Sequence, residues 1–182
     1  ALALPVSVLA VRKPGRASSV LERLTYTSAA LPGIVVALAF VFIGANYAPS
    51  LYQTLPMLLA AYVALYVPQA VGSERSSLLQ ISPKLEEAGR SLGSRPWHVF
   101  RRVTLPLLRP GLMAAGAMVF LSVMKELPAT LILSPIGFDT LAGQVWTNIG
   151  EAFFARAAVP TLLLILLSSL PLALFTLRDG DN

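Results

Sequence analysis

Long apolar stretches separated by short polar segments dominate this 182-residue chain. No charged residue occurs between Arg23 and Glu74, which leaves room for two membrane-spanning helices of about 20 residues each and a turn. Polar residues within positions 46–53 interrupt the apolar pattern and mark that turn. The sequence therefore predicts four full membrane-spanning helices, near Thr27–Ala45, Thr54–Val71, Pro106–Met124 and Ala157–Leu177.

Two further apolar stretches are too short to cross a membrane. Ala1–Val11 is about half a span, and we expect it to be the end of a transmembrane helix that begins upstream of this chain. Leu127–Phe138 contains two prolines and a glycine, which favour a broken or re-entrant segment. The predicted fold class is all-α, a polytopic transmembrane helical bundle. We expect residues 1–182 to form a single transmembrane domain that is incomplete at its N-terminus.

The composition excludes several classes of protein. Hydrophobic residues make up 55% of the chain and charged residues 13%, with a mean hydropathy of +0.71, whereas soluble domains carry about 25% charged residues. This balance argues against a soluble enzyme, a disordered segment and a nucleic-acid-binding domain. The chain has no cysteine, so it contains neither a disulfide framework nor a thiolate metal site.

The basic residues predict how the chain is oriented in the membrane. Most of the 14 Lys and Arg residues lie in two segments, residues 12–23 and residues 75–109. By the positive-inside rule, the loops 12–23 and 73–106 are expected to be cytoplasmic, and two full spans separate them, as this orientation requires. The region 125–156 is then expected outside and the C-terminal tail Arg178–Asn182 inside.

The loop 73–106 is unlike the rest of the chain because it is polar and contains its own helix signals. Ser82-Pro83 is a helix start with proline at the first helical position. Gly93 is expected to end this helix in the left-handed conformation. Ser94-Arg95-Pro96 then begins a second short helix, which Leu105-Pro106 is expected to end at the membrane surface. The pattern predicts a helix–turn–helix hairpin.

One face of the second helix is apolar. Trp97, Phe100 and Val103 recur three residues apart on that face, while the neighbouring arginines point elsewhere. This hairpin is too polar to insert into the membrane, and one of its faces is too apolar to be exposed to water. The pattern therefore favours a protein partner that covers this face. The alternative is an amphipathic hairpin that lies on the lipid headgroups.

The spacing of this loop resembles a known motif. Glu87-Ala88-Gly89, three residues, Gly93, nine residues and then Val103-Thr104-Leu105-Pro106 resembles the EAA loop of binding-protein-dependent ABC transporter permeases. The match departs from the family pattern at Gly89, where the family has a second alanine, and at Val103, where it has isoleucine. The runs 125–130 and 137–142 resemble the ferric-iron-type branch of these permeases.

The resemblance implies a mechanical role for the loop rather than a catalytic one. The loop would be a coupling helix that docks on a separate ATPase, with Gly93 making the turn and Glu87 contacting the ATPase or fixing the loop to its neighbours. The residues implied for this site are Glu87, Ala88, Gly89, Gly93, Trp97, Phe100, Val103, Leu105 and Pro106.

The resemblance also implies a set of partners in a bacterial inner membrane. These are a dimer of ABC ATPase subunits that holds ATP and Mg²⁺, a second permease half or subunit, and a periplasmic substrate-binding protein. The sequence has no G-x-x-x-x-G-K-[ST] phosphate-binding loop, which agrees with ATP being bound elsewhere. We expect no catalytic residue, no cofactor and no metal site on this chain, whose one histidine, His98, cannot form a zinc site alone.

Two ionisable residues outside the loop are candidates for a role in translocation. Lys125 and Glu126 interrupt apolar sequence just before Pro128, and ionisable residues at membrane depth are costly. They could line a pathway or gate, or they could hold the broken segment in place. Asp139 and Thr140, which follow Gly137, are expected to form a turn and a helix cap.

Three classes of function are compatible with a chain of this composition. The resemblance favours the permease of an ATP-driven importer, with ferric iron as the solute. Thiamine, sulfate, molybdate, spermidine and phosphonate are alternatives because related permeases share the pattern. A membrane-embedded enzyme lacks an acid–base constellation in this sequence. A passive channel or membrane scaffold would not need a hairpin that engages a motor.

Overall fold

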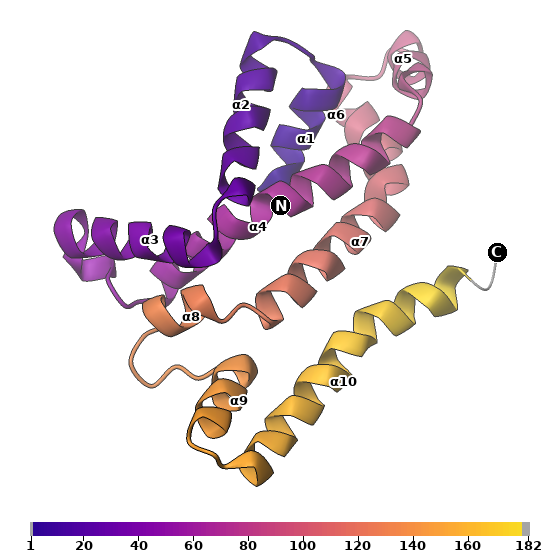
Figure 1. The fold of residues 1–182 in the computed structure, drawn as a ribbon. Helices are drawn as coiled ribbons and strands as arrows, with labels where there is room; N and C mark the ends of the chain where they lie inside the picture. Colours follow the sequence, from indigo (N-terminus) through magenta and orange to yellow (C-terminus); the bar gives the residue numbers. More distant parts are fainter. Residues whose placement is uncertain (1, 180–182) are drawn as a thin grey trace. The chain divides into compact units, whose positions relative to one another are not determined.

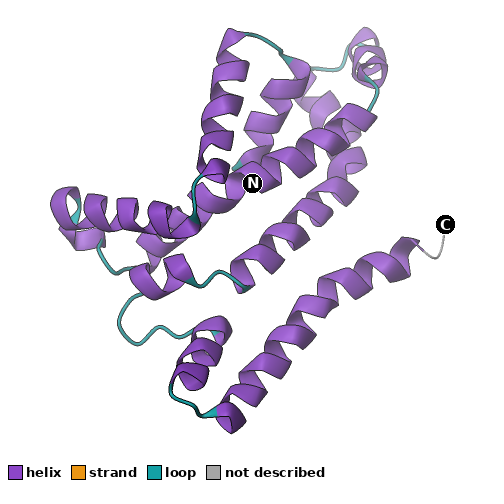
Figure 2. Ribbon diagram, viewed as in Figure 1, coloured by secondary structure: helices purple, strands orange, loops and turns teal. Residues whose placement is uncertain are grey.

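The structure is a computed structural model that describes the backbone of residues 2–179 and the side chains of residues 2–171 (Figure 1). Within this range the chain is helical and contains no strand (Figure 2), which confirms the predicted all-α class. Its α-helices are α1 Ala3–Arg12, α2 Arg16–Thr27, α3 Gly33–Tyr47, α4 Leu55–Gln80, α5 Pro83–Ser91, α6 Pro96–Val99, α7 Leu105–Met124, α8 Pro128–Leu133, α9 Leu141–Gly150 and α10 Phe154–Asp179.

Within the described part of the chain, three helical stretches are long and apolar enough to cross a membrane. They are α4, the continuous stretch Pro96–Met124, and α10 over Phe154–Pro171. A fourth span exists if α2 and α3, which meet at a bend of 106°, are counted as one broken span. The chain therefore has the polytopic character that its apolar runs predict.

The expected helix near Thr27–Ala45 differs from its prediction. It begins only at Gly33, after a short 3-10 turn at Ser28–Ala30, and runs for 15 residues to Tyr47. Pro32 lacks a backbone N–H and restricts Leu31 to extended conformations, so an α-helix cannot continue through this point. The second expected span is longer than predicted, because α4 continues past Val71 as far as Gln80.

The residues group into two compact units. The first unit comprises residues 1–27 and 67–118, and its buried core consists of Leu78, Ile81 and Leu108. Apolar residues of α1 pack against this core. Ser7 of α1 also donates a 2.8 Å hydrogen bond to Glu74 of α4, and both residues are buried. The short α1 is thus fixed to the end of α4 that leads into the loop 73–106.

Of the described residues, the second unit comprises 28–66 and 119–179. Its core is built from α3, α4 and α8 and contains Ala37, Met57, Leu58, Ala61, Ala129 and Leu133. Helix α8 is only six residues long and is followed by a loop with Gly137 in the left-handed conformation, which is the broken segment predicted for Leu127–Phe138. The side chain of Thr140 accepts a 3.1 Å hydrogen bond from the Gly143 N–H and caps α9, as predicted.

Candidate functional site

The candidate site is the hairpin formed by α5, the turn at Gly93 and α6. Pro83 occupies the first position of α5, and the helix ends at Ser91. Gly93 has a φ of +81°, and its N–H donates a 2.9 Å hydrogen bond to the carbonyl of Arg90. Only glycine adopts this φ without strain, so the sequence correctly predicts where the hairpin turns.

Gly89 lets the two helices of the hairpin approach closely. A Cβ atom at position 89 would lie 3.0 Å from a methyl carbon of Val99, which is buried in α6. The glycine that departs from the family pattern is therefore a contact point between α5 and α6. Its cost in helix propensity is about 1 kcal/mol relative to alanine, but it provides the space that the Val99 side chain occupies.

The second helix of the hairpin does not end at Leu105-Pro106, and this expectation is corrected by the structure. A π-helical segment, Phe100–Thr104, follows α6 and leads directly into α7, so that Pro96–Met124 is continuous. The Leu105 N–H bonds to the carbonyl of Phe100, five residues earlier. This wider turn precedes Pro106, whose ring would clash with the carbonyl four residues back in a regular α-helix.

The hairpin presents aromatic and charged side chains to its surroundings. Trp97 is 65% exposed and stacks on Phe100 with ring centroids 5.7 Å apart. Ala88 and Glu87 are exposed on α5, and Val103 is half-buried. An exposed indole beside a stacked aromatic ring is typical of a surface that binds a protein partner.

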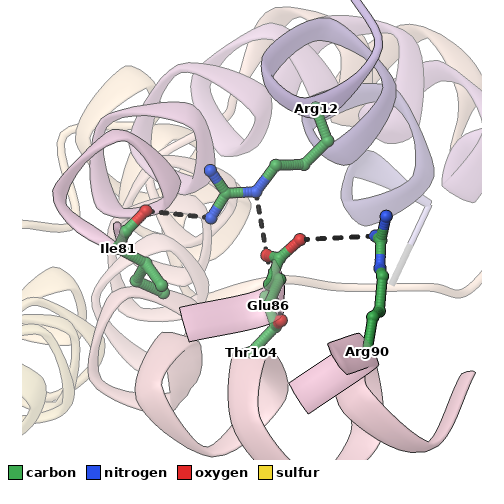
Figure 3. Close-up of polar contacts among 5 residues, drawn as sticks. All are labelled: Arg12, Ile81, Glu86, Arg90 and Thr104. Atoms are coloured by element: carbon green, nitrogen blue, oxygen red, sulfur yellow. Dashed lines mark hydrogen bonds and ion pairs between the residues drawn. The ribbon is translucent and has the colours of Figure 1, made fainter. Parts of the chain in front are cut away.

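The neighbouring glutamate, Glu86, has a different environment from Glu87. Its side chain is only 12% exposed. It accepts a 2.9 Å hydrogen bond from Nε of Arg12 and a 3.1 Å hydrogen bond from the hydroxyl of Thr104, and Arg90 lies 3.9 Å away (Figure 3). Arg12 also donates a 2.9 Å hydrogen bond to the carbonyl of Ile81. We call these five residues the Glu86 cluster.

The sequence places Glu86 in the first turn of the first hairpin helix but does not single it out as a site residue. The only local signal was the four-residue spacing between Glu86 and Arg90, which is ordinary for a helical ion pair. Its principal partner, Arg12, is 74 residues away in the sequence. Glu87, which is predicted to contact the ATPase or to fix the hairpin to its neighbours, is exposed. The adjacent Glu86 makes the contacts with Arg12 and Thr104.

A largely apolar groove of about 600 Å³ lies between α1 and the hairpin. Leu4, Val8 and Leu9 of α1 form one wall, and Trp97, Val99 and Phe100 form the other. Arg12 and Glu86 also line it. The ion pair between Arg12 and Glu86 therefore joins the hairpin to the end of α1 within the first unit, and the groove lies beside this contact.

The second group of candidates, Lys125, Glu126 and Pro128, lies at the start of α8. The Glu126 carboxylate accepts a 3.0 Å hydrogen bond from the Ala129 N–H and a 2.5 Å hydrogen bond from the hydroxyl of Tyr66. Pro128 is the first residue of α8, and Lys125 is exposed. These contacts show that Glu126 caps α8 and holds it against α4. A role for the three residues in a pathway or gate stays a prediction.

A neighbouring hydrogen bond reinforces this contact between α4 and α8. The hydroxyls of Tyr62 and Thr130 lie 2.5 Å apart, and Thr130 donates to the carbonyl of Glu126 at 2.7 Å. Among the residues whose side chains are described, no group of three or more His, Cys, Asp or Glu side chains could hold a metal ion.

Comparison with known proteins gives two kinds of match. Residues 3–179 match the family described as "Binding-protein-dependent transport system inner membrane component". The chain is 42% identical, over 172 residues, to the Fe(3+)-transport system permease protein FbpB 2 of Haemophilus influenzae, covering 94% of this chain and 34% of that protein.

A second relative is named for a different solute. The chain is 30% identical, over 165 residues, to the putative 2-aminoethylphosphonate transport system permease protein PhnV of Salmonella typhimurium, covering 90% of this chain and 62% of that protein. The chain thus spans about a third of the length of the first relative and less than two thirds of the second.

Proposed function

This chain belongs to the family of binding-protein-dependent transport system inner membrane components, and on this premise we propose that it forms part of the translocation pathway of an ATP-driven importer. A periplasmic binding protein delivers the solute. A dimer of separate ATPase subunits binds ATP and Mg²⁺, and the chain itself is a transport component rather than an enzyme.

The observation that carries this proposal is the hairpin. Its turn is exposed at Gly93, and Glu87, Ala88 and Trp97 are exposed next to it. The loop also has the glycine-centred geometry expected of a coupling element. The hairpin is partly apolar and continues into a membrane-spanning helix. A movement of the ATPase that displaces the hairpin can therefore be transmitted to that helix.

The orientation of the chain in the membrane is inferred from the distribution of its basic residues and from the ion pair between Arg12 and Glu86. The chain is a multi-pass inner-membrane protein, and we infer that segments 12–23 and 73–106 and the C-terminus are cytoplasmic. The ion pair between Arg12 and Glu86 supports placing the first two segments on the same side of the membrane. Of the C-terminal tail, residues 180–182 lie outside the described residues.

We infer that the solute is ferric iron. The 42% identity to a permease whose name specifies Fe(3+) supports this choice, and it exceeds the 30% identity to a permease whose name specifies 2-aminoethylphosphonate. Phosphonate is therefore the principal alternative. The second permease half is either part of a longer parent chain or a separate subunit, because the iron-transport relative is about three times the length of the matched region.

Co-purification tests the coupling role. The full-length parent is extracted in mild detergent with its ATPase, as the unaltered protein and as Gly93→Asp. We expect the unaltered protein to retain the ATPase and Gly93→Asp to lose most of it while still inserted. The matched control is Gly137→Asp, because Gly137 has the same φ of +81° and the same open surroundings as Gly93 but lies in the loop expected outside.

The outcomes separate the candidate functions. If the unaltered protein retains no ATPase, the importer proposal is wrong, and a channel or scaffold becomes the better interpretation. The solute is tested by reconstituting the complex in vesicles and measuring ATP hydrolysis with the iron-loaded or the phosphonate-loaded binding protein. Stimulation by the phosphonate-loaded protein alone would contradict iron as the solute.

A further inference from the structure

We propose that the Glu86 cluster is the mechanical connection between the coupling hairpin and the membrane helices that flank it. In this inference Glu86, rather than the motif residue Glu87, is the positioning residue through which a displacement of the hairpin reaches α1. The inference rests on the proposed function, because it concerns how a push from the ATPase is transmitted.

The carboxylate of Glu86 joins three elements, and Arg12 extends the cluster to a fourth. Glu86 belongs to α5, Arg12 is the last residue of α1, and Thr104 ends the π-helical segment that leads into α7. Arg12 in turn donates to the carbonyl of Ile81, directly after α4. A displacement of α5 therefore acts on the ends of three helices through hydrogen bonds of 2.9–3.1 Å.

The low exposure of this pair distinguishes it from an ordinary surface ion pair. The side chains of Arg12 and Glu86 are 14% and 12% exposed. By contrast, the ion pair between Arg75 and Glu22 has side chains that are 46% and 22% exposed. Exposed pairs contribute little because water and salt screen them. A shielded, multiply hydrogen-bonded carboxylate holds its partners in one geometry, which a mechanical connection requires.

The two adjacent glutamates then have separate tasks. Glu87 is exposed on α5 and is available to the ATPase, while Glu86 is directed inward to Arg12 and Thr104 (Figure 3). Both residues are on the same short helix, α5. In this inference the helix is displaced by the ATPase at the surface around Glu87, and Glu86 transmits that displacement to Arg12 and Thr104.

The test separates two properties of the full importer: binding of the ATPase to the permease, and the coupling of ATP hydrolysis to transport in reconstituted vesicles. The variants are Glu86→Gln, Arg12→Gln and the double variant, with Lys84→Gln on α5 and Lys13→Gln beside Arg12 as the matched neighbouring controls. Two quantities are measured for each: the ATPase retained on purification, and the solute transported per ATP hydrolysed. We expect Glu86→Gln and Arg12→Gln to retain the ATPase and to lower the transport ratio about fivefold or more.

Because the two residues act as one connection, the double variant should be no worse than either single variant. Additive losses would overturn the proposal, as would a normal transport ratio in Glu86→Gln. Loss of the ATPase from Glu86→Gln would also overturn it, since Glu86 would then shape the docking surface itself. An unaltered importer that binds no ATPase would instead contradict the proposed function.

A conservative substitution provides a second route if Glu86→Gln does not insert into the membrane. Arg12→Lys keeps a cation opposite Glu86, whereas Arg12→Gln does not. The connection predicts that Arg12→Lys recovers most of the transport ratio lost in Arg12→Gln. Equal transport ratios in these two variants would overturn the proposal.

Discussion

Gly111 of α7 lies directly against Ser77 of α4, and we predict that alanine at position 111 destabilises the protein. A Cβ atom at position 111 would lie well inside 3.0 Å of both Oγ and Cβ of Ser77. A Cβ atom is held close to the backbone and cannot rotate away, so the two helices would have to separate. This substitution therefore tests the contact between α4 and α7 at Ser77 and Gly111.

The expected magnitude follows from two opposing effects. Overpacking of a well-packed contact costs about 1–3 kcal/mol, while replacing a helical glycine by alanine recovers up to about 1 kcal/mol. We expect Gly111→Ala to lower the free energy of unfolding by about 1–2 kcal/mol, which corresponds to a decrease in Tm of roughly 2–8 °C. Gly116→Ala on the same helix is the control, since a Cβ there meets nothing within 4 Å, and its Tm should be unchanged or higher.

The assay is the thermal midpoint of the detergent-solubilised protein, followed by size-exclusion chromatography after heating. Ser77→Gly removes both atoms that the new Cβ would meet, so it should recover stability in Gly111→Ala although it is itself unfavourable in a helix. The reasoning is refuted if Gly111→Ala is as stable as Gly116→Ala. It is also refuted if Ser77→Gly leaves the penalty of Gly111→Ala unchanged.

Three further substitutions have defined outcomes. Gly93→Val should weaken ATPase retention on co-purification more than Gly93→Asn, because asparagine tolerates a φ of +81° better than a β-branched residue. Glu126→Ala removes the acceptor of two hydrogen bonds and should cost about 2–3 kcal/mol of stability, measured as Tm; a loss of transport at unchanged Tm would instead support a role in the pathway. Thr140→Ala should cost about 1 kcal/mol through loss of the α9 cap, and Thr140→Ser should restore the Tm.

Features set by short-range interactions were predictable from the residues alone. The apolar runs specify membrane-spanning helices because each span must satisfy its own backbone hydrogen bonds in lipid. Gly93 specifies the hairpin turn because a side chain would be strained at its φ, and Thr140 specifies a helix start through its own hydroxyl. In each case the cause lies within a few residues of its effect.

Two of the boundaries that differ from their prediction lie beside prolines, whose effect depends on the surrounding backbone. Pro32 immediately precedes the first residue of α3, whereas Pro106 is accommodated within a continuous helical stretch because the preceding π-helical turn shifts the hydrogen bonding ahead of it. The same local rules apply to both prolines, but the outcomes differ. The sequence around Pro106 did not show that the chain would widen its turn rather than stop.

The residues alone thus establish the all-α membrane architecture, the hairpin and its resemblance to a coupling loop. Only the tertiary structure shows that Glu86 pairs with Arg12, that Gly89 makes room for Val99 and that Gly111 faces Ser77. The physical reason is separation along the chain: Arg12 and Glu86 are 74 positions apart, and no local propensity or spacing rule identifies partners that meet only when α1, α4 and α7 pack together.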